Sequence, residues 1–295
     1  MQLLCWNMSG PLRAGSVVDL HEAAWHWIAA LQPDVALLQE THVPVWARDH
    51  WTVIAEPQRD IDFGTVLLAR PGVGLRPLPG SPRNDILSDR LTATAELDLG
   101  DGTSMVLASV SGDGWLRQTS LPATPPSSPD VEQPGDALLE AFGDLVAGRR
   151  FLVGGDLEIA RYLDAPQPVA EDAAFFDRVA AAGWVELSLD ADGREGRTWF
   201  GSRAEAMFQP DHVFGDAETR SCRTAFEIDS WPAAKVDLSD HAALVLILDI
   251  DLSPVPGEPE WDPDMAYIAE RFHKTLWLED RKPEEQRRES QGRER

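Results

Sequence analysis

The stretch that most constrains the fold of this chain is Leu238 to Ile250, LSDHAALVLILDI. Its second half, Ala243 to Ile250, is a continuous apolar run, which is typical of a buried central strand. Ser239, Asp240 and His241 stand directly before that run. A carboxylate and an imidazole at the start of a buried strand need each other or a metal ion, because unpaired buried charge is unfavourable. The alternative is a capping aspartate beside a half-exposed histidine.

Three further apolar segments end on polar residues: Met1 to Asn7, Val35 to Glu40 and Phe151 to Glu158. In the last of these, two glycines let the backbone turn tightly, and the segment then delivers Asp156 and Glu158 at its carboxyl end. If these strand ends converge in space, one pocket is lined by Asn7, Glu40, Asp156, Glu158, Asp240 and His241.

Five sequence motifs follow one another at spacings that fit one domain. They are the asparagine that ends the first strand, LQPDVALLQET, a strand containing Gly-Asp, QPDHVF, and SDH before the last strand. Together, from Met1 to Asp251, they resemble the endonuclease/exonuclease/phosphatase superfamily, the fold of deoxyribonuclease I, apurinic endonucleases and inositol-phosphate phosphatases. The resemblance implies a two-sheet α/β sandwich of the deoxyribonuclease I-like type, with helices on the outer faces and a pocket at one edge.

Two acidic residues are candidates for a metal site. Glu40 stands at a strand end and offers a hard oxygen ligand for Mg²⁺ or Mn²⁺, which take one or two carboxylates and keep several waters. Asp240 would complete the site, and Asn7 would hold the Glu40 carboxylate or a water in place. The resemblance implies the same roles. Asn7 could instead cap a turn.

Three other residues are candidates for the hydrolysis of a phosphate ester. Asp156 would orient or deprotonate the attacking water. Asp211 and His241 would form a pair in which the carboxylate fixes the ring tautomer and stabilises an imidazolium that faces the phosphate. The resemblance implies these roles too. The structural alternatives are a Gly-Gly-Asp turn at Asp156 and a pair between Asp211 and its neighbour His212.

The chain departs from the family pattern at two places. The superfamily usually has an asparagine two residues after the Gly-Asp aspartate, where this chain has Glu158. It usually has a histidine or tyrosine at the end of the mid-chain strand, where the nearest residues are Ser109 and Ser111. Glu158 would repel a phosphate unless it were protonated or bound to a metal ion. A second cation that bridges Glu158 and Asp156 would neutralise both carboxylates.

The formal net charge of −24 limits the choice of partners. A protein that grips long duplex DNA usually presents a basic face, so tight non-specific duplex binding is not expected. A phosphorylated small molecule or a short nucleic acid fits better. We expect no membrane span, because no apolar run approaches the required length, and a cytoplasmic location, because no signal region begins the chain. Cys5 and Cys222 are expected to be free thiols.

Apolar periodicity predicts the remaining elements of one domain over residues 1–252. Helices are expected at Ser16 to Leu31, Asp136 to Ala147 and Glu171 to Ala182. Further strands are expected at Gly64 to Ala69, Leu91 to Leu97, Thr103 to Val110, Trp184 to Leu187, Arg197 to Phe200, Gln209 to Phe214 and Ser221 to Ile228.

The carboxyl-terminal part has a different composition. Residues 253–264 form a proline-rich linker, residues 265–278 have the spacing of a short amphipathic helix, and residues 279–295 are a charged tail that we expect to be disordered. The helix is expected to dock on its own domain, although a role in dimerisation or partner binding is a further alternative.

The sequence therefore predicts a Mg²⁺- or Mn²⁺-dependent phosphoesterase that hydrolyses a phosphodiester, as a nuclease does, or a phosphomonoester. The alternative is a catalytically degenerate member that acts as a binding or regulatory module. Glu158 and the two serines favour that alternative. Glu40 and the Asp211/His241 pair oppose it, because a site without catalysis has no chemical need for them.

Overall fold

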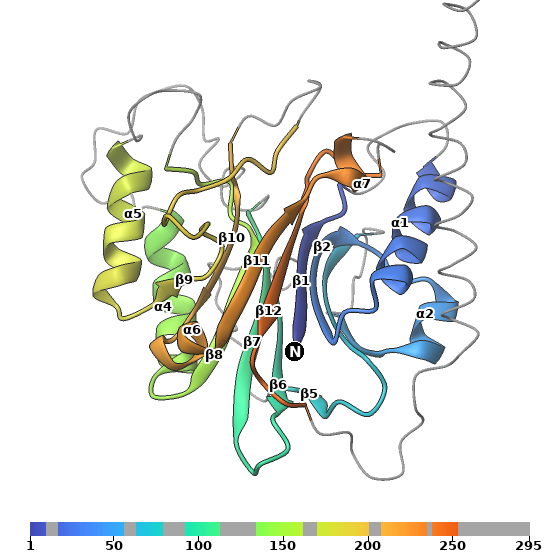
Figure 1. Cartoon of the computed structure of the whole chain (residues 1–295), viewed down its shortest axis with the longest axis horizontal. Coiled ribbons are helices and arrows are strands. Elements are labelled where there is room, and N and C mark those ends of the chain that lie inside the picture. The colour runs from blue at the N-terminus through green and yellow to red at the C-terminus, as the bar shows by residue number, and fades with distance from the viewer. Residues whose placement is uncertain are drawn as a thin grey trace, which may run out of the picture.

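Two six-stranded sheets are packed face to face in the computed structural model (Figure 1). The structure describes residues 1–9, 17–55, 63–78, 92–112, 134–161, 170–200, 208–234 and 238–252. The first sheet has the order β11 (Arg223–Asp229), β12 (Ala243–Leu248), β1 (Gln2–Asn7), β2 (Val35–Thr41), β4 (Gly64–Ala69) and β3 (Thr52–Ala55). The second has the order β5 (Leu75–Pro77), β6 (Thr92–Asp98), β7 (Ser104–Ser111), β8 (Arg150–Asp156), β10 (Asp211–Gly215) and β9 (Val185–Glu186).

Each sheet contains one parallel pair at its centre. β1 runs parallel to β2 in the first sheet, and β7 runs parallel to β8 in the second, whereas the other paired strands are antiparallel. Within a parallel pair the carboxyl ends of both strands lie at the same edge of the sheet. This connectivity brings the polar residues that end β1 and β2 together, and likewise those that end β7 and β8.

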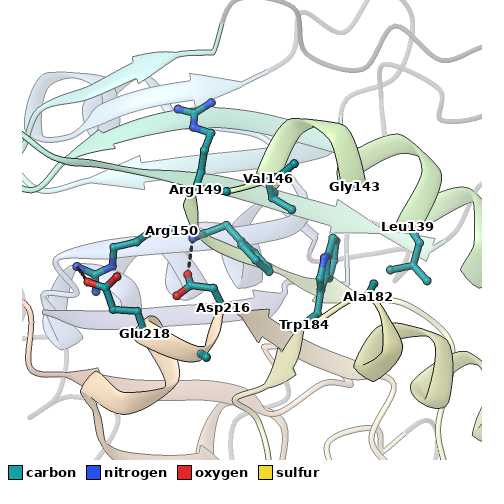
Figure 2. A pocket seen from close by; sticks show the side chains of 14 residues that line it. Leu139, Gly143, Val146, Arg149, Arg150, Ala182, Trp184, Asp216 and Glu218 are labelled. Atoms are coloured by element: carbon teal, nitrogen blue, oxygen red, sulfur yellow. Dashed lines mark hydrogen bonds and ion pairs between the residues drawn. The ribbon is translucent and has the colours of Figure 1, made fainter.

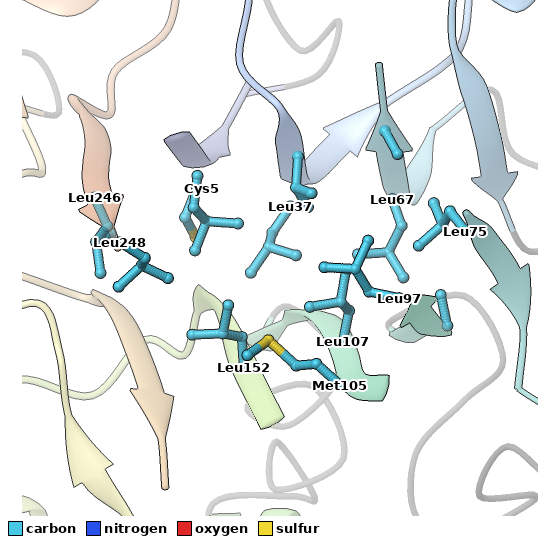
Figure 3. Packing of buried hydrophobic residues seen from close by; sticks show 14 of the residues in the cluster. Cys5, Leu37, Leu67, Leu75, Leu97, Met105, Leu107, Leu152, Leu246 and Leu248 are labelled. Atoms are coloured by element: carbon cyan, nitrogen blue, oxygen red, sulfur yellow. The ribbon is translucent and has the colours of Figure 1, made fainter. Parts of the chain in front are cut away.

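Alternation along the strands separates an inner face from an outer face in both sheets. The inner faces meet in an apolar layer that includes Leu37 and Leu67 from the first sheet and Leu107 and Leu152 from the second (Figure 3). All four side chains are fully buried, and burying a leucine contributes roughly 2 kcal/mol. Cys5 lies in the same layer as a free thiol, as predicted.

Helices cover the outer face of each sheet (Figure 1). α1 (Val17–Leu31) and α2 (Val45–His50) pack on the first sheet around Trp6 and Trp25. α4 (Pro134–Val146) and α5 (Ala170–Ala181) pack on the second sheet around Phe142 and Phe214. Two short helices, α6 (Ala217–Cys222) and α7 (Trp231–Ala234), flank β11. The predicted fold class, a two-sheet α/β sandwich with outer helices, is confirmed.

A few element predictions differ from the structure. The segment Arg197 to Phe200 is not a strand, because only Trp199 forms isolated bridges, with Phe208 and His241. The short strands β3 and β5 escaped sequence reasoning, since four and three residues carry too little periodicity. The predictions for residues 253–295 fall outside the described part of the chain. No helix among the described residues is long and apolar enough to cross a membrane.

Candidate active site

The end of β8 places Asp156 at the edge of the inter-sheet layer. A Cβ atom on the preceding Gly155 would lie 1.8 Å from the carbonyl oxygen of Val110, and its φ of 153° also favours glycine. The absence of a side chain thus permits β8 to lie tightly against β7. Asp156 is in register with Ser111 of β7 on one side and with Asp211 of β10 on the other. The close packing of this strand end therefore fixes two aspartates side by side.

The amide of Asn7 joins the two sheets at this edge. Its Nδ2 donates a hydrogen bond to Glu40 Oε1 at 3.0 Å and another to Asp156 Oδ2 at 2.8 Å. Its Oδ1 accepts a hydrogen bond from the backbone amide of Ser9 at 2.8 Å. Because the side chain is buried, these three contacts hold it in one orientation. Residues from the ends of β1, β2 and β8 thus meet, as the sequence predicted.

Glu40 reaches Asn7 because β2 is irregular at its end. The pairing register between β2 and β4 shifts between Leu38 and Thr41, and Glu40 has a φ of 48°. Regular alternation from the inward-facing Leu37 would place Glu40 on the outer face. An irregularity of this kind re-aims a side chain. The bend therefore directs the Glu40 carboxylate toward the same edge as Asp156.

Asp211 and His241 form the predicted pair. Nδ1 of His241 lies 2.9 Å from Asp211 Oδ2, and Thr198 donates a hydrogen bond from its hydroxyl to the same oxygen. Nε2 of His241 lies 3.8 Å from Asp156 Oδ2 and 3.9 Å from Asp240 Oδ1, which is beyond hydrogen-bond distance. Asp211 therefore orients the ring, and Nε2 faces the space between the other two carboxylates. The alternative pair of Asp211 with His212 does not form, because successive strand residues point to opposite faces.

The backbone around His241 is also fixed by side chains. Trp6 donates from its indole nitrogen to the carbonyl oxygen of His241 at 3.0 Å, and Ser239 Oγ accepts from the His241 amide at 2.9 Å. Ser9 donates from its hydroxyl to Asp240 Oδ1. Since Ser9 also binds the Asn7 amide oxygen, it connects Asp240 to the Asn7 centre. Asp240 is more accessible than Asp156 and Asp211, because 28% of its side chain is exposed, against 8% and 1% of theirs.

The site shifts the titration of two of its groups. Burial alone would lower the pKa of His241, but the charges of Asp211 and Asp156 outweigh burial and raise that pKa to about 10. Burial raises the pKa of Asp156 to about 6, with a further increase from Asp211 and an opposing decrease from His241. At neutral pH the ring is therefore an imidazolium, while Asp156, with its pKa of about 6, is mostly ionised.

The charge of the cluster fits a divalent cation. Within the described part of the chain, His241 is the only cationic group that pairs with Asp156, Asp211 and Asp240. Three carboxylates therefore share one imidazolium, and Glu40 adds a fourth carboxylate through Asn7. One ligand atom from each of Asp156, Asp211 and His241 lies within 4.8 Å of the others. Carboxylate oxygens in excess of cationic side chains are the donor set that Mg²⁺ and Mn²⁺ prefer.

The structure places the departures from the family pattern in different surroundings. The amide of Glu158 donates to Asp156 Oδ1 at 3.0 Å, while its exposed side chain extends over Gly112. Ser109 is fully buried between the sheets, where it donates to the carbonyl oxygen of Leu38 and accepts from Gln39. Ser111, in register with Asp156, is the serine at the site edge. Ser109 therefore supports the sheet packing rather than the site.

Sequence reasoning missed two residues that hold the site together. Ser9 contacts both Asn7 and Asp240, and Thr198 fixes Asp211 from a segment without regular structure. Hydroxyl residues outside strand ends give no periodic signal. For Ser9, the spacing of two residues after the strand-ending asparagine was the only available hint, because an asparagine side chain commonly bonds the amide two residues on.

A separate pocket lies at the opposite end of β8 (Figure 2). Its volume is about 500 Å³, and its walls include Trp184, Arg149 and Arg150. The arginines pair with Glu96 and Glu218, respectively. Because β8 rises about 3.3 Å per residue, the Arg150 end lies roughly 20 Å from Asp156. This pocket is therefore not part of the acidic cluster.

Comparison with known proteins identifies the family of this chain. The profile of the endonuclease/exonuclease/phosphatase family matches residues 4–241. The chain belongs to this family. Asn7, Glu40, Asp156, Asp211 and His241 all lie within the matched range. A comparison with curated proteins finds no significant match.

Solved structures share the endonuclease/exonuclease/phosphatase fold with this chain. The 3′-5′ exonuclease (NExo) from Neisseria meningitidis is 18% identical with a TM-score of 0.62, covering 84% of this chain and 100% of that one. An AP endonuclease from Archaeoglobus fulgidus is 14% identical with a TM-score of 0.60, covering 85% and 100%. AP endonuclease LMAP from Leishmania major is 16% identical with a TM-score of 0.59, covering 83% and 86%. The two mixed sheets are thus those of a nuclease and phosphatase fold.

Proposed function

We propose that this protein is a Mg²⁺- or Mn²⁺-dependent phosphoesterase that hydrolyses a phosphodiester or a phosphomonoester by attack of water. The observation that carries the proposal is the meeting of Glu40 and Asp156 on the Asn7 amide beside the Asp211/His241 pair. Membership of a family of nucleases and phosphatases supports it.

The metal ligands in this proposal are Glu40 and Asp240. Their carboxylates are partly exposed, and both are linked to Asn7, one directly and the other through Ser9. A bound cation would supply a Lewis acid that polarises a phosphoryl oxygen and stabilises its developing charge. Asn7 would keep the Glu40 carboxylate in place and also fix Asp156.

The remaining residues have roles in the proton and charge transfers. Asp156 accepts a proton from the attacking water as the water oxygen bonds to phosphorus. The ester P–O bond breaks, and the leaving alkoxide takes a proton from solvent to become an alcohol. The His241 imidazolium donates a hydrogen bond from Nε2 to the phosphoryl oxygen on which negative charge builds up. Asp211 holds the ring by its Nδ1 side and keeps it protonated.

For the substrate we propose a small phosphorylated molecule or a short nucleic acid. The net charge of −24 would repel a long polyanion at a distance. The Neisseria enzyme in the comparison is a 3′-5′ exonuclease, and the Archaeoglobus and Leishmania enzymes are AP endonucleases. This supports a nucleic acid as one of the substrates to test. Glu158, as an exposed acid beside Asp156, disfavours a substrate with several phosphates at this position.

The experiment that tests this proposal measures hydrolysis of bis-p-nitrophenyl phosphate, p-nitrophenyl phosphate, and short single- and double-stranded DNA. Each is assayed with Mg²⁺, with Mn²⁺ and with a chelator. We expect metal-dependent turnover by the wild-type protein and its loss in Glu40→Ala and His241→Ala.

Glu227→Ala is the control, because Glu227 is an exposed acid on β11. It should retain wild-type turnover. Turnover that persists in both site variants would contradict the proposal. Absence of wild-type turnover on every substrate would favour the alternative that the protein is a catalytically degenerate binding module, to which Glu158 and Ser111 point.

A further inference from the structure

A second cluster of charged side chains lies on the outer face of β10, behind the active site. His212 follows Asp211 in the strand and points to the opposite face, where its Nδ1 lies 2.8 Å from Glu186 Oε1. Arg161 Nη1 lies 2.5 Å from Glu186 Oε2 and 2.9 Å from Glu195 Oε1. The side chains of His212, Glu186 and Glu195 are at most 5% exposed. We call these four residues the outer cluster.

The histidine and the two glutamates of the outer cluster are side chains that can bind a metal ion, but the hydrogen bonds of His212 exclude a metal site. Nε2 of His212 lies 2.7 Å from the carbonyl oxygen of Ile159. Since both ring nitrogens face acceptors, both must donate, and the ring is an imidazolium without a lone pair for a metal. Burial lowers the pKa of His212, but the Glu186 charge and hydrogen bond outweigh burial and raise it overall. Two cations and two carboxylates therefore balance within the outer cluster.

The outer cluster fastens two segments that bear on the active site. The first follows β8: Arg161 and Ile159 come shortly after Asp156, and the Arg161 amide also donates to Glu195 Oε2 at 3.1 Å. The second contains Glu195, three residues before Thr198, whose hydroxyl holds Asp211. Arg161 thus ties the segment after Asp156 to the segment that supports Asp211.

The packing around the outer cluster restricts its movement. The Arg161 guanidinium carbon lies 3.6 Å from the ring centroid of Phe176 in α5, and Phe176 packs edge-on against the His212 ring. A buried ion network of this kind is seldom needed for stability, because apolar side chains of similar volume stabilise a core equally well. Its specific contribution is a fixed relative position of the parts it joins.

We propose that the outer cluster is a positioning network for the active site, in which Arg161 fixes the segments 157–161 and 194–200 so that Asp156 and Asp211 stay at their catalytic spacing. This inference rests on the proposed phosphoesterase function for its kinetic consequences. Its structural consequence, the order of the two segments, can be measured without any substrate. The residues act through Asp156 and Asp211 and do not touch the substrate.

The test uses the full chain with Arg161→Met, Arg161→Lys and the control Arg149→Met. Arg149 is similarly exposed, 33% against 25% for Arg161, and pairs with Glu96 of the same sheet at the far end of β8. Amide hydrogen exchange is measured by mass spectrometry. In Arg161→Met we expect exchange to rise at least tenfold in segments 157–161 and 194–200 and to stay unchanged in β1 and β12. Arg149→Met should leave both segments as in wild type.

Kinetics supply the second readout. With the substrate that wild type hydrolyses best, Arg161→Met should lower kcat at least tenfold with less than threefold change in KM, and Arg161→Lys should recover part of kcat. Unchanged kcat, or an exchange increase spread over the whole chain, would overturn the proposal. If wild type hydrolyses nothing, the proposed function fails. Exchange then decides the positioning role alone: a rise confined to the two segments supports it, and any other pattern overturns it.

Discussion

The two faces of β10 carry clusters of similar residue types that differ in net charge. On the inner face, Asp211 and Asp156 flank the His241 imidazolium, with Asp240 nearby. On the outer face, Glu186 and Glu195 flank the His212 imidazolium, with Arg161 as a second cation. Among the described residues, Arg161 makes the difference. It balances the outer carboxylates, whereas the inner carboxylates outnumber His241, their one cationic partner. The same residue types thus form a charge-balanced ion network on the outer face and, on the inner face, the acidic cluster that we propose binds a cation.

This difference also concerns which ligand atoms are accessible. Both ring nitrogens of His212 lie within hydrogen-bond distance of an acceptor. Among the described residues, only Nδ1 of His241 does so. Its Nε2 lies 3.8 Å from Asp156 and 3.9 Å from Asp240, and we propose that it donates to the phosphate. Proximity of acids and histidines alone therefore does not identify a catalytic site. The properties that differ between the two clusters are the charge balance and whether the Nε2–H of the imidazolium already has a hydrogen-bond acceptor.

The largest expected effect comes from removing charge on the inner face. Asp156→Asn should lower kcat by roughly 10²- to 10⁴-fold, the usual contribution of a general base. At pH 8, without metal ions, its stability should equal or exceed that of wild type, because the variant relieves the excess negative charge. Kinetics and urea unfolding at that pH measure both quantities. A decrease in the free energy of unfolding of more than about 2 kcal/mol would contradict the view that the buried Asp156 carboxylate destabilises the folded protein.

The matched change on the outer face should have the opposite effect on stability. Glu186→Gln leaves Arg161 and His212 without one of their carboxylates, and breaking a buried ion pair costs about 3 to 5 kcal/mol. Urea unfolding of this variant beside Asp156→Asn compares the two faces directly. Equal effects on stability would show that charge balance does not distinguish the clusters.

The dependence of stability on pH should come mainly from the inner face. The native pKa of His241 is about 10, above its ordinary value of about 6.5, so the folded protein binds the proton more tightly. Its contribution is complete below pH 6.5 and is lost as the pH rises toward 10, by on the order of 5 kcal/mol. Unfolding at pH 6.5, 8 and 9.5 should show this decrease, and His241→Gln should flatten it. If the free energy of unfolding falls with pH as steeply in His241→Gln as in wild type, the pH dependence comes from another group.

The smallest expected effect is the stabilisation by a bound metal ion, which should depend on the inner cluster and not on the outer one. Mn²⁺ at ten times its dissociation constant should stabilise the protein by roughly 1.4 kcal/mol, which raises Tm by about 3 to 6 °C. Glu40→Gln should abolish this shift. Glu195→Gln should retain it, since Glu195 belongs to the charge-balanced outer cluster and not to the proposed ligands Glu40 and Asp240. Thermal unfolding with and without Mn²⁺ tests both variants. A Tm shift that is lost only in Glu195→Gln would show that the metal binds on the outer face of β10, against the proposal.

From the amino-acid sequence alone, the resemblance carried by the five motifs implied the sandwich, and apolar periodicity predicted its principal strands and the residues at their ends. Apolar runs such as Ala243 to Ile250 are strong local signals, and a strand end is a place where a polar side chain is easily recognised. The resemblance carried by the five ordered motifs then implied roles in one site for Asn7, Glu40, Asp156, Asp211, Asp240 and His241. The parallel pairs β1/β2 and β7/β8 bring the ends of their strands together.

Only the tertiary structure decided how these residues act on one another. The re-aimed Glu40 depends on a backbone irregularity, and the hydroxyl contacts of Ser9 and Thr198 depend on segments without periodicity. The outer cluster joins Arg161, Glu186, Glu195 and His212 from four separate places in the chain. Such contacts follow from how sheets and loops pack in three dimensions, and no local pattern encodes them. That packing alone separates the balanced face of β10 from the acidic one.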